Sequence, residues 1–272
     1  QTDFDGGFAT IGAMADGREA FLLDGWRCEP GMINHRLAFI ALPDDHTCVQ
    51  FALATIGEVR LYPGRRLGVK LEVPNDLFNG RTRRYVSAAG ERRLESHHGE
   101  PRVIDLASSW VNVEDRIGLV GLRGAETWSI LQRGRPIGAQ PRGYPSITTD
   151  ALCFGVTGRE IGETELPQEV FGPATLIDTA AVVMASVTAD RTRAFAEASR
   201  AALLAATRAT RLVAVHALDD RRYLIAVNFA DDPAELELPA GDTQWIGSAG
   251  DRCEVSRALT LPALSAHVLA VQ

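Results

Sequence analysis

Apolar residues repeat with a period of two along most of the chain, and short clusters of Gly, Pro, Asn and Asp interrupt them. Because successive side chains of a strand point to opposite faces of a sheet, this pattern is typical of half-buried β-strands. The segment 35–56 predicts two strands joined by the turn residues 43–46, and the run 66–76 predicts a strand that ends at Pro74. Further strands are predicted in 126–132, 150–156 and 175–187.

Two local features of this pattern predict a change of direction in the backbone. The stretch 19–26 predicts a strand that turns at Asp24-Gly25, since Asp-Gly is a frequent hairpin pair. In the stretch 110–122, Glu114 and Asp115 stand side by side between two runs of Val, Ile and Leu. We expect these two acids at the tip of a hairpin.

The segment 188–211 departs from the period of two. It is rich in Ala, Leu, Glu and Arg and contains neither Gly nor Pro, which favours a helix. Its few large apolar residues are Phe195, Leu203 and Leu204, so this helix has a small contact face. We expect it to connect two β regions.

Composition and charge limit the classes of function. The chain has 272 residues, 46% of them hydrophobic, which is ample for a core. Its formal net charge of −7 argues against nucleic acid as a partner, because phosphate tracking needs a basic surface. Apolar runs are much shorter than the roughly 20 residues of a membrane-spanning helix, so no membrane association is expected.

Motifs for several kinds of chemistry are absent from the sequence. It contains no GxSxG, P-loop, HExxH or dinucleotide-binding pattern, so we expect no cofactor. Cys28, Cys48, Cys153 and Cys253 are scattered without CxxC spacing, which favours buried thiols over bridges or a zinc site. Neighbouring His97 and His98 point to opposite faces of an extended backbone, so no metal site is predicted.

The C-terminal part carries a resemblance to a known family. The stretch "YLIAVNFADDPAELELP" presents a central strand from Tyr223 to Phe229, a strand-end asparagine at Asn228 and the turn Ala230-Asp231-Asp232-Pro233. The stretch "LTLPALSAHVLAV" presents a Pro-containing loop that leads into a closing strand. Residues 212–271 thereby resemble the small C-terminal β-sandwich that follows the catalytic barrel in α-amylase-type glycoside hydrolases, a module that is usually non-catalytic.

The first 187 residues are similar, more loosely, to the large antiparallel sandwich of polysaccharide lyases and several glycoside hydrolases. The fold we expect is therefore mainly β. It consists of a large antiparallel β-sandwich in 1–187, a connecting helix in 188–211 and a small C-terminal β-sandwich in 212–272.

Candidate catalytic groups follow from the two chemistries that this resemblance implies. A glycosidase needs two carboxyl groups that face each other across the scissile bond, which makes Glu114 and Asp115 weak candidates as an adjacent pair. Asp44-Asp45 suits a turn after Pro43, and the acidic cluster 160–169 suits a polar loop. A lyase needs a base to abstract a proton beside a carboxylate, and His35 in Asn34-His35-Arg36 is the candidate base.

Tryptophans are the candidate sugar-binding residues, because an indole can stack on the apolar face of a pyranose ring. Trp26 and Trp245 lie beside turn glycines, where exposure is favoured. Trp110 and Trp128 lie within strand patterns and are expected in the core.

Three hypotheses for the function follow. In the first, the chain is the β-sandwich portion of a carbohydrate-active enzyme and packs against a catalytic domain or a second chain. In the second it is an autonomous polysaccharide lyase or glycosidase, and in the third a non-catalytic carbohydrate-binding module. A carbohydrate is the expected ligand in each. Since the sequence begins without Met and directly in a strand pattern, we expect a processed chain or a piece of a longer protein.

Overall fold

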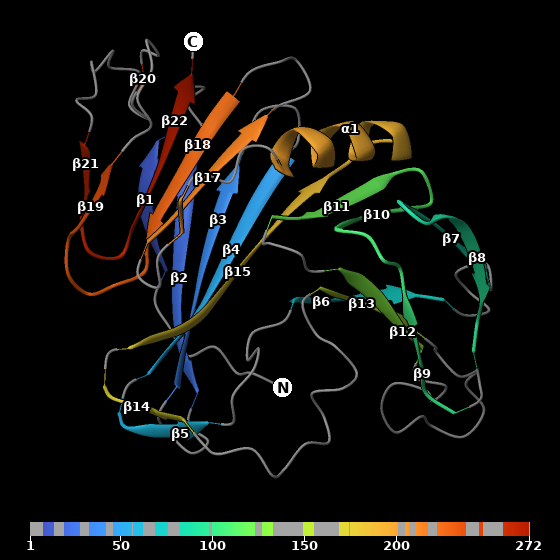
Figure 1. Ribbon diagram of the computed structural model, residues 1–272, viewed down its shortest axis with the longest axis horizontal. Helices are drawn as coiled ribbons and strands as arrows, with labels where there is room; N and C mark the ends of the chain where they lie inside the picture. Colours follow the sequence, from blue (N-terminus) through green and yellow to red (C-terminus); the bar gives the residue numbers. More distant parts are fainter. Residues whose placement is uncertain are drawn as a thin grey trace.

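The architecture of the chain is a set of antiparallel β-sheets stacked in layers, with one helix among the described residues (Figure 1). The computed structural model describes residues 8–13, 19–27, 33–41, 46–55, 57–61, 69–75, 82–97, 100–122, 127–132, 149–154, 169–173, 175–200, 205–206, 210–216, 222–237, 245–246 and 258–271. This agrees with the predicted mainly β fold class and is consistent with a β-sandwich.

The largest sheet has nine strands in the order β1-β2-β3-β4-β15-β11-β10-β7-β8. Its strands are β1 (Phe8–Ala13), β2 (Glu19–Arg27), β3 (Ile33–Ala41), β4 (His46–Thr55), β7 (Thr82–Ser87), β8 (Gly90–Glu95), β10 (Trp110–Val113), β11 (Ile117–Gly121) and β15 (Leu176–Ala185). Alternate residues of the central strand β15 enter two different cores: Ala181 and Val183 lie on one face, Val182 and Met184 on the other. The sheet is therefore covered on both faces in its middle.

A four-stranded sheet, in the order β6-β13-β12-β9, covers one face of the β7-β10-β11 half. Its strands are β6 (Val69–Pro74), β9 (Arg102–Asp105), β12 (Trp128–Gln132) and β13 (Thr149–Phe154). Trp128 and Phe154 fill this core with ring centroids 5.1 Å apart, against Tyr85 and Val111 of the large sheet. The short strands β5 (Val59–Leu61) and β14 (Glu169–Phe171) pair separately.

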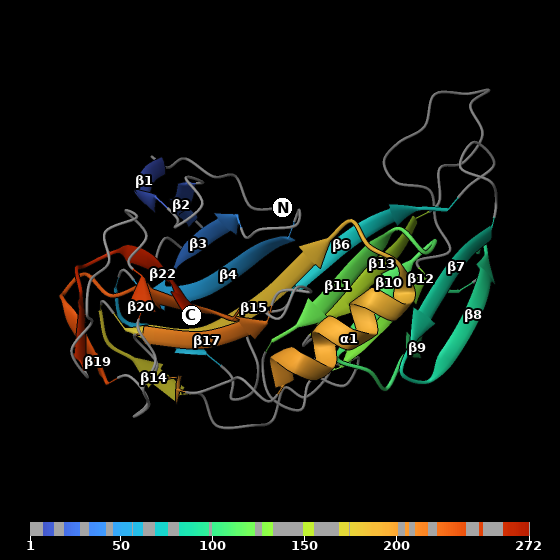
Figure 2. The ribbon, with the colours of Figure 1, turned by 90° about the horizontal axis from the view of Figure 1, so that it is seen from above.

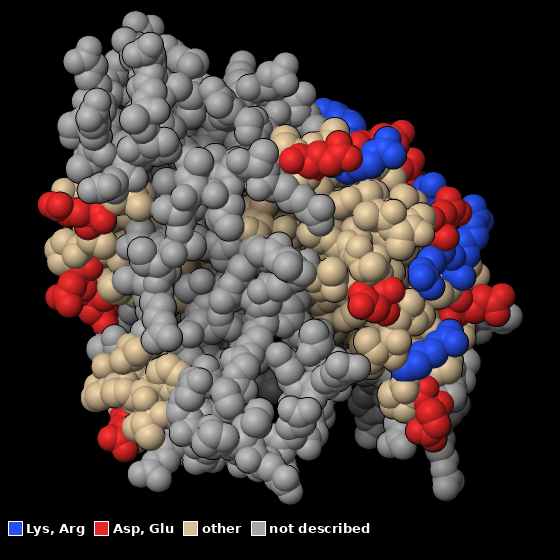
Figure 3. Space-filling model, in the orientation of Figure 1, with Lys and Arg blue, Asp and Glu red and all other residues tan. Residues whose placement is uncertain are grey.

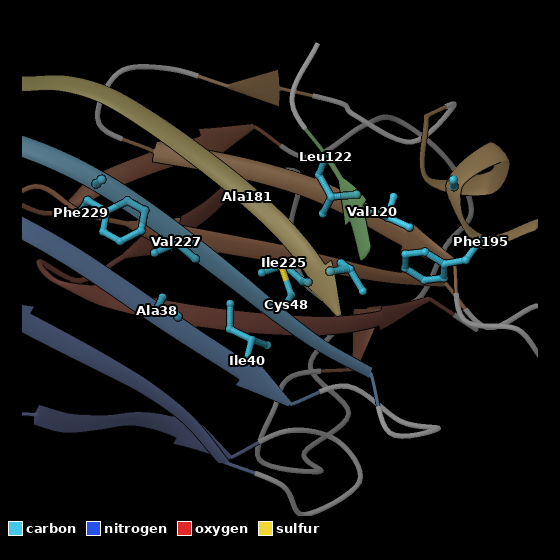
Figure 4. Packing of buried hydrophobic residues seen from close by; sticks show 14 of the residues in the cluster. Ala38, Ile40, Cys48, Val120, Leu122, Ala181, Phe195, Ile225, Val227 and Phe229 are labelled. Atoms are coloured by element: carbon cyan, nitrogen blue, oxygen red, sulfur yellow. The ribbon is translucent and has the colours of Figure 1, made fainter. Parts of the chain in front are cut away.

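The C-terminal strands cover the opposite face, over β3, β4 and β15 (Figure 4). They form a five-stranded sheet, β16-β17-β18-β22-β20, and a two-stranded one, β19-β21. Their bounds are β16 (Ala205–Ala206), β17 (Thr210–His216), β18 (Arg222–Asn228), β19 (Ala234–Glu237), β20 (Trp245–Ile246), β21 (Ala258–Leu261) and β22 (Ser265–Val271). Ile225, Val227 and Phe229 share one buried cluster with Ala38 and Ile40, so this sheet and the large one close a common core.

Helix α1 (Ala189–Arg200) continues this second layer over β10 and β11 (Figure 2). Phe195 on its inner side stacks on His46 at a centroid distance of 5.0 Å. Beneath the helix, the buried Asn112 amide donates to the Val187 carbonyl (2.8 Å) and to Thr192 Oγ1 (2.9 Å). A side chain at Gly118 would overlap Thr192, so this glycine allows the helix to approach the sheet closely.

Two local predictions are wrong. The helix predicted over 188–211 ends at Arg200, because residues 205–206 pair with residues 211–212 as parts of strands β16 and β17. The turn predicted at Asp24-Gly25 is not formed, since β2 continues to Arg27 and pairs with β3 from Ala20 to Arg27. In both places, hydrogen bonding to a neighbouring strand outweighs the local preference.

Other sequence predictions are confirmed. The strands predicted around 35–56, 66–76, 126–132, 150–156 and 175–187 are present as β3, β4, β6, β12, β13 and β15. Trp110 and Trp128 are buried, as are Cys48 and Cys153. Residues 42–45, Cys28 and Cys253 lie outside the described residues. The division into two separate sandwich domains stays a prediction.

None of the helices in the described part of the chain is long and apolar enough to span a membrane.

Replacing Gly121 by Ala is expected to destabilise the fold by about 1–3 kcal/mol. A methyl group there would overlap the Phe154 ring, which is held in place by its packing on Trp128. Urea unfolding of Gly121→Ala measures the effect. Gly172→Ala is the matched control, since its methyl group meets nothing within 4 Å, and its change should stay within about 0.5 kcal/mol. Equal stabilities of the two variants would contradict this account of the core.

Candidate functional site

A cluster of polar side chains in the interior surrounds Asp150 on β13. This carboxylate is 2% exposed and lies between the four-stranded sheet and the β7–β8 hairpin. Gln132 and Arg102 continue the same cross-strand row on β12 and β9. Tyr85 reaches the cluster from β7, and Asn75 from the residue after β6. Five segments far apart in the sequence thus meet at one acidic group.

Three donors hydrogen-bond the Asp150 carboxylate. The Tyr85 hydroxyl and Asn75 Nδ2 donate to Oδ2 at 2.7 and 2.9 Å, and Gln132 Nε2 donates to Oδ1 at 2.8 Å. A buried charge is tolerated when hydrogen bonds to it replace those lost from water. These three bonds therefore account for the presence of an acid in this interior.

The same amides connect the cluster to the edge strand β8. Asn75 Nδ2 also donates to the Leu94 carbonyl (3.1 Å), and Gln132 Nε2 donates to the Glu95 carbonyl (3.2 Å). The Arg102 guanidinium donates to Gln132 Oε1 at 2.8 and 2.6 Å, which orients the amide toward Asp150. These hydrogen bonds connect the four-stranded sheet and the residue after β6 to β8, the edge strand of the nine-stranded sheet.

Tyr85 cannot serve as the base of a lyase in this environment. Burial, followed by the charge and the hydrogen bond of Asp150, raises the pKa of its phenol far above the ordinary value. A phenol with a raised pKa keeps its proton at neutral pH and acts only as a donor. The chemistry that this cluster supports is structural hydrogen bonding.

Tyr85 should make the folded state sensitive to alkaline pH. The unfolded phenol ionises near pH 10, and the folded phenol at a higher pH, so the stabilisation is complete below about pH 10 and is lost above it. We expect this residue to contribute a loss of about 1.4 kcal/mol per pH unit above that point. Urea unfolding from about pH 8 to pH 11 should show this component in the parent chain and not in Tyr85→Phe. Parallel pH profiles of the two chains would refute the assignment.

Glu114 and Asp115 form the hairpin turn between β10 and β11, as the sequence predicted. Both have a φ of +56°, and the Arg116 N–H donates to the Val113 carbonyl at 3.0 Å. Positive φ at both central residues is the requirement of the hairpin turns that match strand twist, and Asp is among the residues that tolerate it.

The two turn carboxylates bind different parts of the protein. Glu114 Oε1 accepts from the Arg84 backbone N–H (3.1 Å) and lies 3.5 Å from Arg83 Nη1. Asp115 Oδ1 accepts from the Ala189 N–H at the start of α1 (2.7 Å). An anion at this position satisfies a helix-terminal donor and interacts favourably with the helix dipole. Each acid has its own structural contact, so the structure does not assemble the two as a facing pair.

For the remaining candidate residues from the sequence, the structure describes the backbone position only. His35 lies in β3, with Gly25 and Leu53 as its register partners. Trp26 lies in β2 opposite Asn34, and Trp245 lies in β20 opposite Val271. The side chains of all three lie outside the described part of the structure, as do residues 160–168. Within the described ranges, no group of three His, Cys, Asp or Glu side chains could hold a metal ion.

Charged side chains alternate in sign on the surface of the β7–β8 hairpin, at the right-hand edge of Figure 3. Glu91 accepts from Arg84 Nε at 2.9 Å and from Arg93 Nε at 3.0 Å. The hydrogen bond from Arg84, followed by that from Arg93, lowers the pKa of the Glu91 carboxyl. Because charged residues discourage pairing of an edge strand with another chain, these residues protect the exposed edge of β8.

Sequence reasoning missed the Asp150 cluster. Asn75, Tyr85, Arg102, Gln132 and Asp150 are spread over 76 positions without a motif, and only the strand pairing brings them together. The sequence feature that could have indicated this cluster is a polar residue at the end of an apolar strand. Gln132 has this position in "WSILQ", and Asp150 has it in "DALCF".

No family model matches this chain, and no curated protein matches it. The expected resemblance of residues 212–271 to a glycoside hydrolase module therefore stays a prediction from the sequence.

Proposed function

We propose that this chain is the β-sandwich portion of a carbohydrate-active enzyme, a glycoside hydrolase or a polysaccharide lyase. Its main role is to pack against a catalytic domain, on the same polypeptide or on a second chain, and to shape the cleft of that domain. The observation that carries the proposal is the structural use of the candidate catalytic acids. The resemblance of residues 212–271 to a usually non-catalytic module supplies the enzyme class.

The geometry of the described acids argues for a supporting role. A glycosidase needs two carboxyl groups about 5–10 Å apart on opposite sides of the scissile bond. Glu114 binds the β7 backbone, Asp115 binds the N-terminus of α1, and Asp150 is enclosed by three donors. Each of these three acids makes a hydrogen bond that holds parts of the fold together. Burial raises the pKa of the neighbouring Tyr85 phenol, so this group keeps its proton at neutral pH.

The C-terminal sheet has the same supporting character. Asn228, at the end of β18, donates to the carbonyls of Asp232 (2.9 Å) and Pro262 (3.0 Å) and accepts from the Ala230 N–H (3.0 Å). These bonds fasten the turns 230–233 and 261–264 to the central strand. Both the asparagine and the buried residues beside it serve the fold, as expected of a module whose task is packing.

Turnover measurements test the proposal. The 272-residue chain alone should leave a panel of neutral and acidic polysaccharides unchanged, whereas the complete product of its gene, or the chain together with its partner, should cleave one of them. Release of reducing ends reports hydrolysis, and ultraviolet absorbance of unsaturated products reports lyase action. Turnover by the isolated chain would overturn the proposal in favour of an autonomous enzyme.

Substitutions at Asp115 separate a structural role from a catalytic one. Asp115→Ala removes the acceptor at the N-terminus of α1 and should cost about 0.5–2 kcal/mol of stability, while Asp115→Asn keeps an acceptor oxygen and should cost less. The turnover number of the active assembly should stay within about twofold of the parent for both variants. A general acid or base at this position would instead show a loss of about 100-fold or more in both.

A further inference from the structure

The C-terminal layer, which consists of α1 and strands β16–β22, is joined to the rest of the fold by a single stretch of chain. The last strand of the large sheet, β15, ends at Ala185, and α1 begins at Ala189. The four-stranded sheet is joined differently, because its strands alternate along the chain with strands of the large sheet. Of these two layers, the C-terminal layer can leave the large sheet by rotation about one connection.

Hydrogen bonds hold the C-terminal layer to the large sheet beside this connection. Asn112 Nδ2 donates to the Val187 carbonyl at 2.8 Å and to Thr192 Oγ1 at 2.9 Å. Asp115 Oδ1 accepts from the Ala189 N–H at 2.7 Å. These contacts fix the residues around 187–192 on β10 and β11, which is where a hinge for the layer must be held in place.

Further from the connection, the interface between the C-terminal layer and the large sheet buries an amide group. We call this interface the C-terminal seam. Gln50 on β4 pairs with Ala38 and Ala181, which both belong to the core under the C-terminal layer (Figure 4). Its side chain is 0% exposed, and neither Nε2 nor Oε1 has a hydrogen-bond partner in the described structure. Closing the seam therefore removes this amide from water without replacing its hydrogen bonds, which favours an open state.

The apolar residues of the C-terminal seam also bury less area per residue than those under the four-stranded sheet. The described part of its core includes the alanines Ala38, Ala52, Ala181, Ala196 and Ala266. The core under the four-stranded sheet includes Trp128, Tyr85 and Phe154, and its described members include no alanine. Since hydrophobic stabilisation is roughly proportional to apolar area, and the Asp150 hydrogen bonds reinforce the second core, the C-terminal seam is the weaker of the two.

We propose that the C-terminal layer is a lid that opens and closes as one unit about residues 186–188, while the large sheet and the four-stranded sheet stay folded. Units that open together are commonly contiguous in sequence and have fewer stabilising contacts than the rest of a protein. The open state exposes the face of β3, β4 and β15 that carries Ile40, Cys48 and Gln50. This inference goes beyond the proposed function and does not depend on it.

Thiol labelling tests the lid, because Cys48 is 0% exposed and lies in the C-terminal seam. It is the single remaining cysteine after the substitutions Cys28→Ser, Cys153→Ala and Cys253→Ser. The matched control chain carries Cys48→Ala in addition and Val182→Cys, which places the thiol on the neighbouring strand β15 but under the four-stranded sheet. In excess of an aromatic disulfide reagent and without denaturant, Cys48 should react at least about tenfold faster than the thiol of the control chain.

Two further substitutions assign the opening to the C-terminal seam. Gln50→Leu removes the buried amide and should slow the labelling of Cys48 by about fivefold or more. Gly121→Ala overlaps Phe154 in the other core, so it should speed the labelling of the control chain by about fivefold or more. It should leave the labelling of Cys48 within about twofold, because opening of the lid does not break that core.

Hydrogen exchange of the unmodified 272-residue chain, followed by mass spectrometry, tests the lid without any substitution. Peptides from β17, β18 and β22 should exchange together and faster than peptides from β12 and β13. Equal exchange of the two groups, equal labelling of the two thiols in folded chains, or faster labelling of Cys48 in the Gln50→Leu chain would overturn the lid. Thermal unfolding establishes that each substituted chain folds, and the exchange measurement decides the question where one does not.

Discussion

The middle of the nine-stranded sheet is apolar on both faces, and the layered structure follows from the need to keep both of these faces out of water. Along β15, Ala181 and Val183 enter one core while Val182 and Met184 enter the other. Burial of apolar area is the main stabilising contribution to folding, so each face requires a second layer. The four-stranded sheet covers one face, and the C-terminal sheet with α1 covers the other.

Polar groups enter this layered structure where one layer must be fastened to another. Asp150 and its three donors link the four-stranded sheet to the outer strands β7 and β8. Asn112 and Asp115 hold the first turn of α1 against β10 and β11. Because an unpaired buried polar group costs about 1–3 kcal/mol, such contacts stabilise one particular arrangement of the layers over others.

The placement of these groups bears on function. Acids and a tyrosine that could belong to a glycosidase or a lyase are used here for caps, turns and interior hydrogen bonds. The proposed supporting role within a carbohydrate-active enzyme is consistent with that use.

The sequence by itself determined the elements whose cause is local. The period of two determined most strands, and the Glu114-Asp115 pair between apolar runs determined a hairpin turn. The Ala-rich segment after Thr188 determined that a helix forms, although its end at Arg200 depended on the pairing of β16 with β17. The path of β2 through Asp24-Gly25 likewise depended on β3. Only the tertiary structure decided which face of each strand is covered and which residues meet at Asp150, because strand order and register join positions that no local pattern connects.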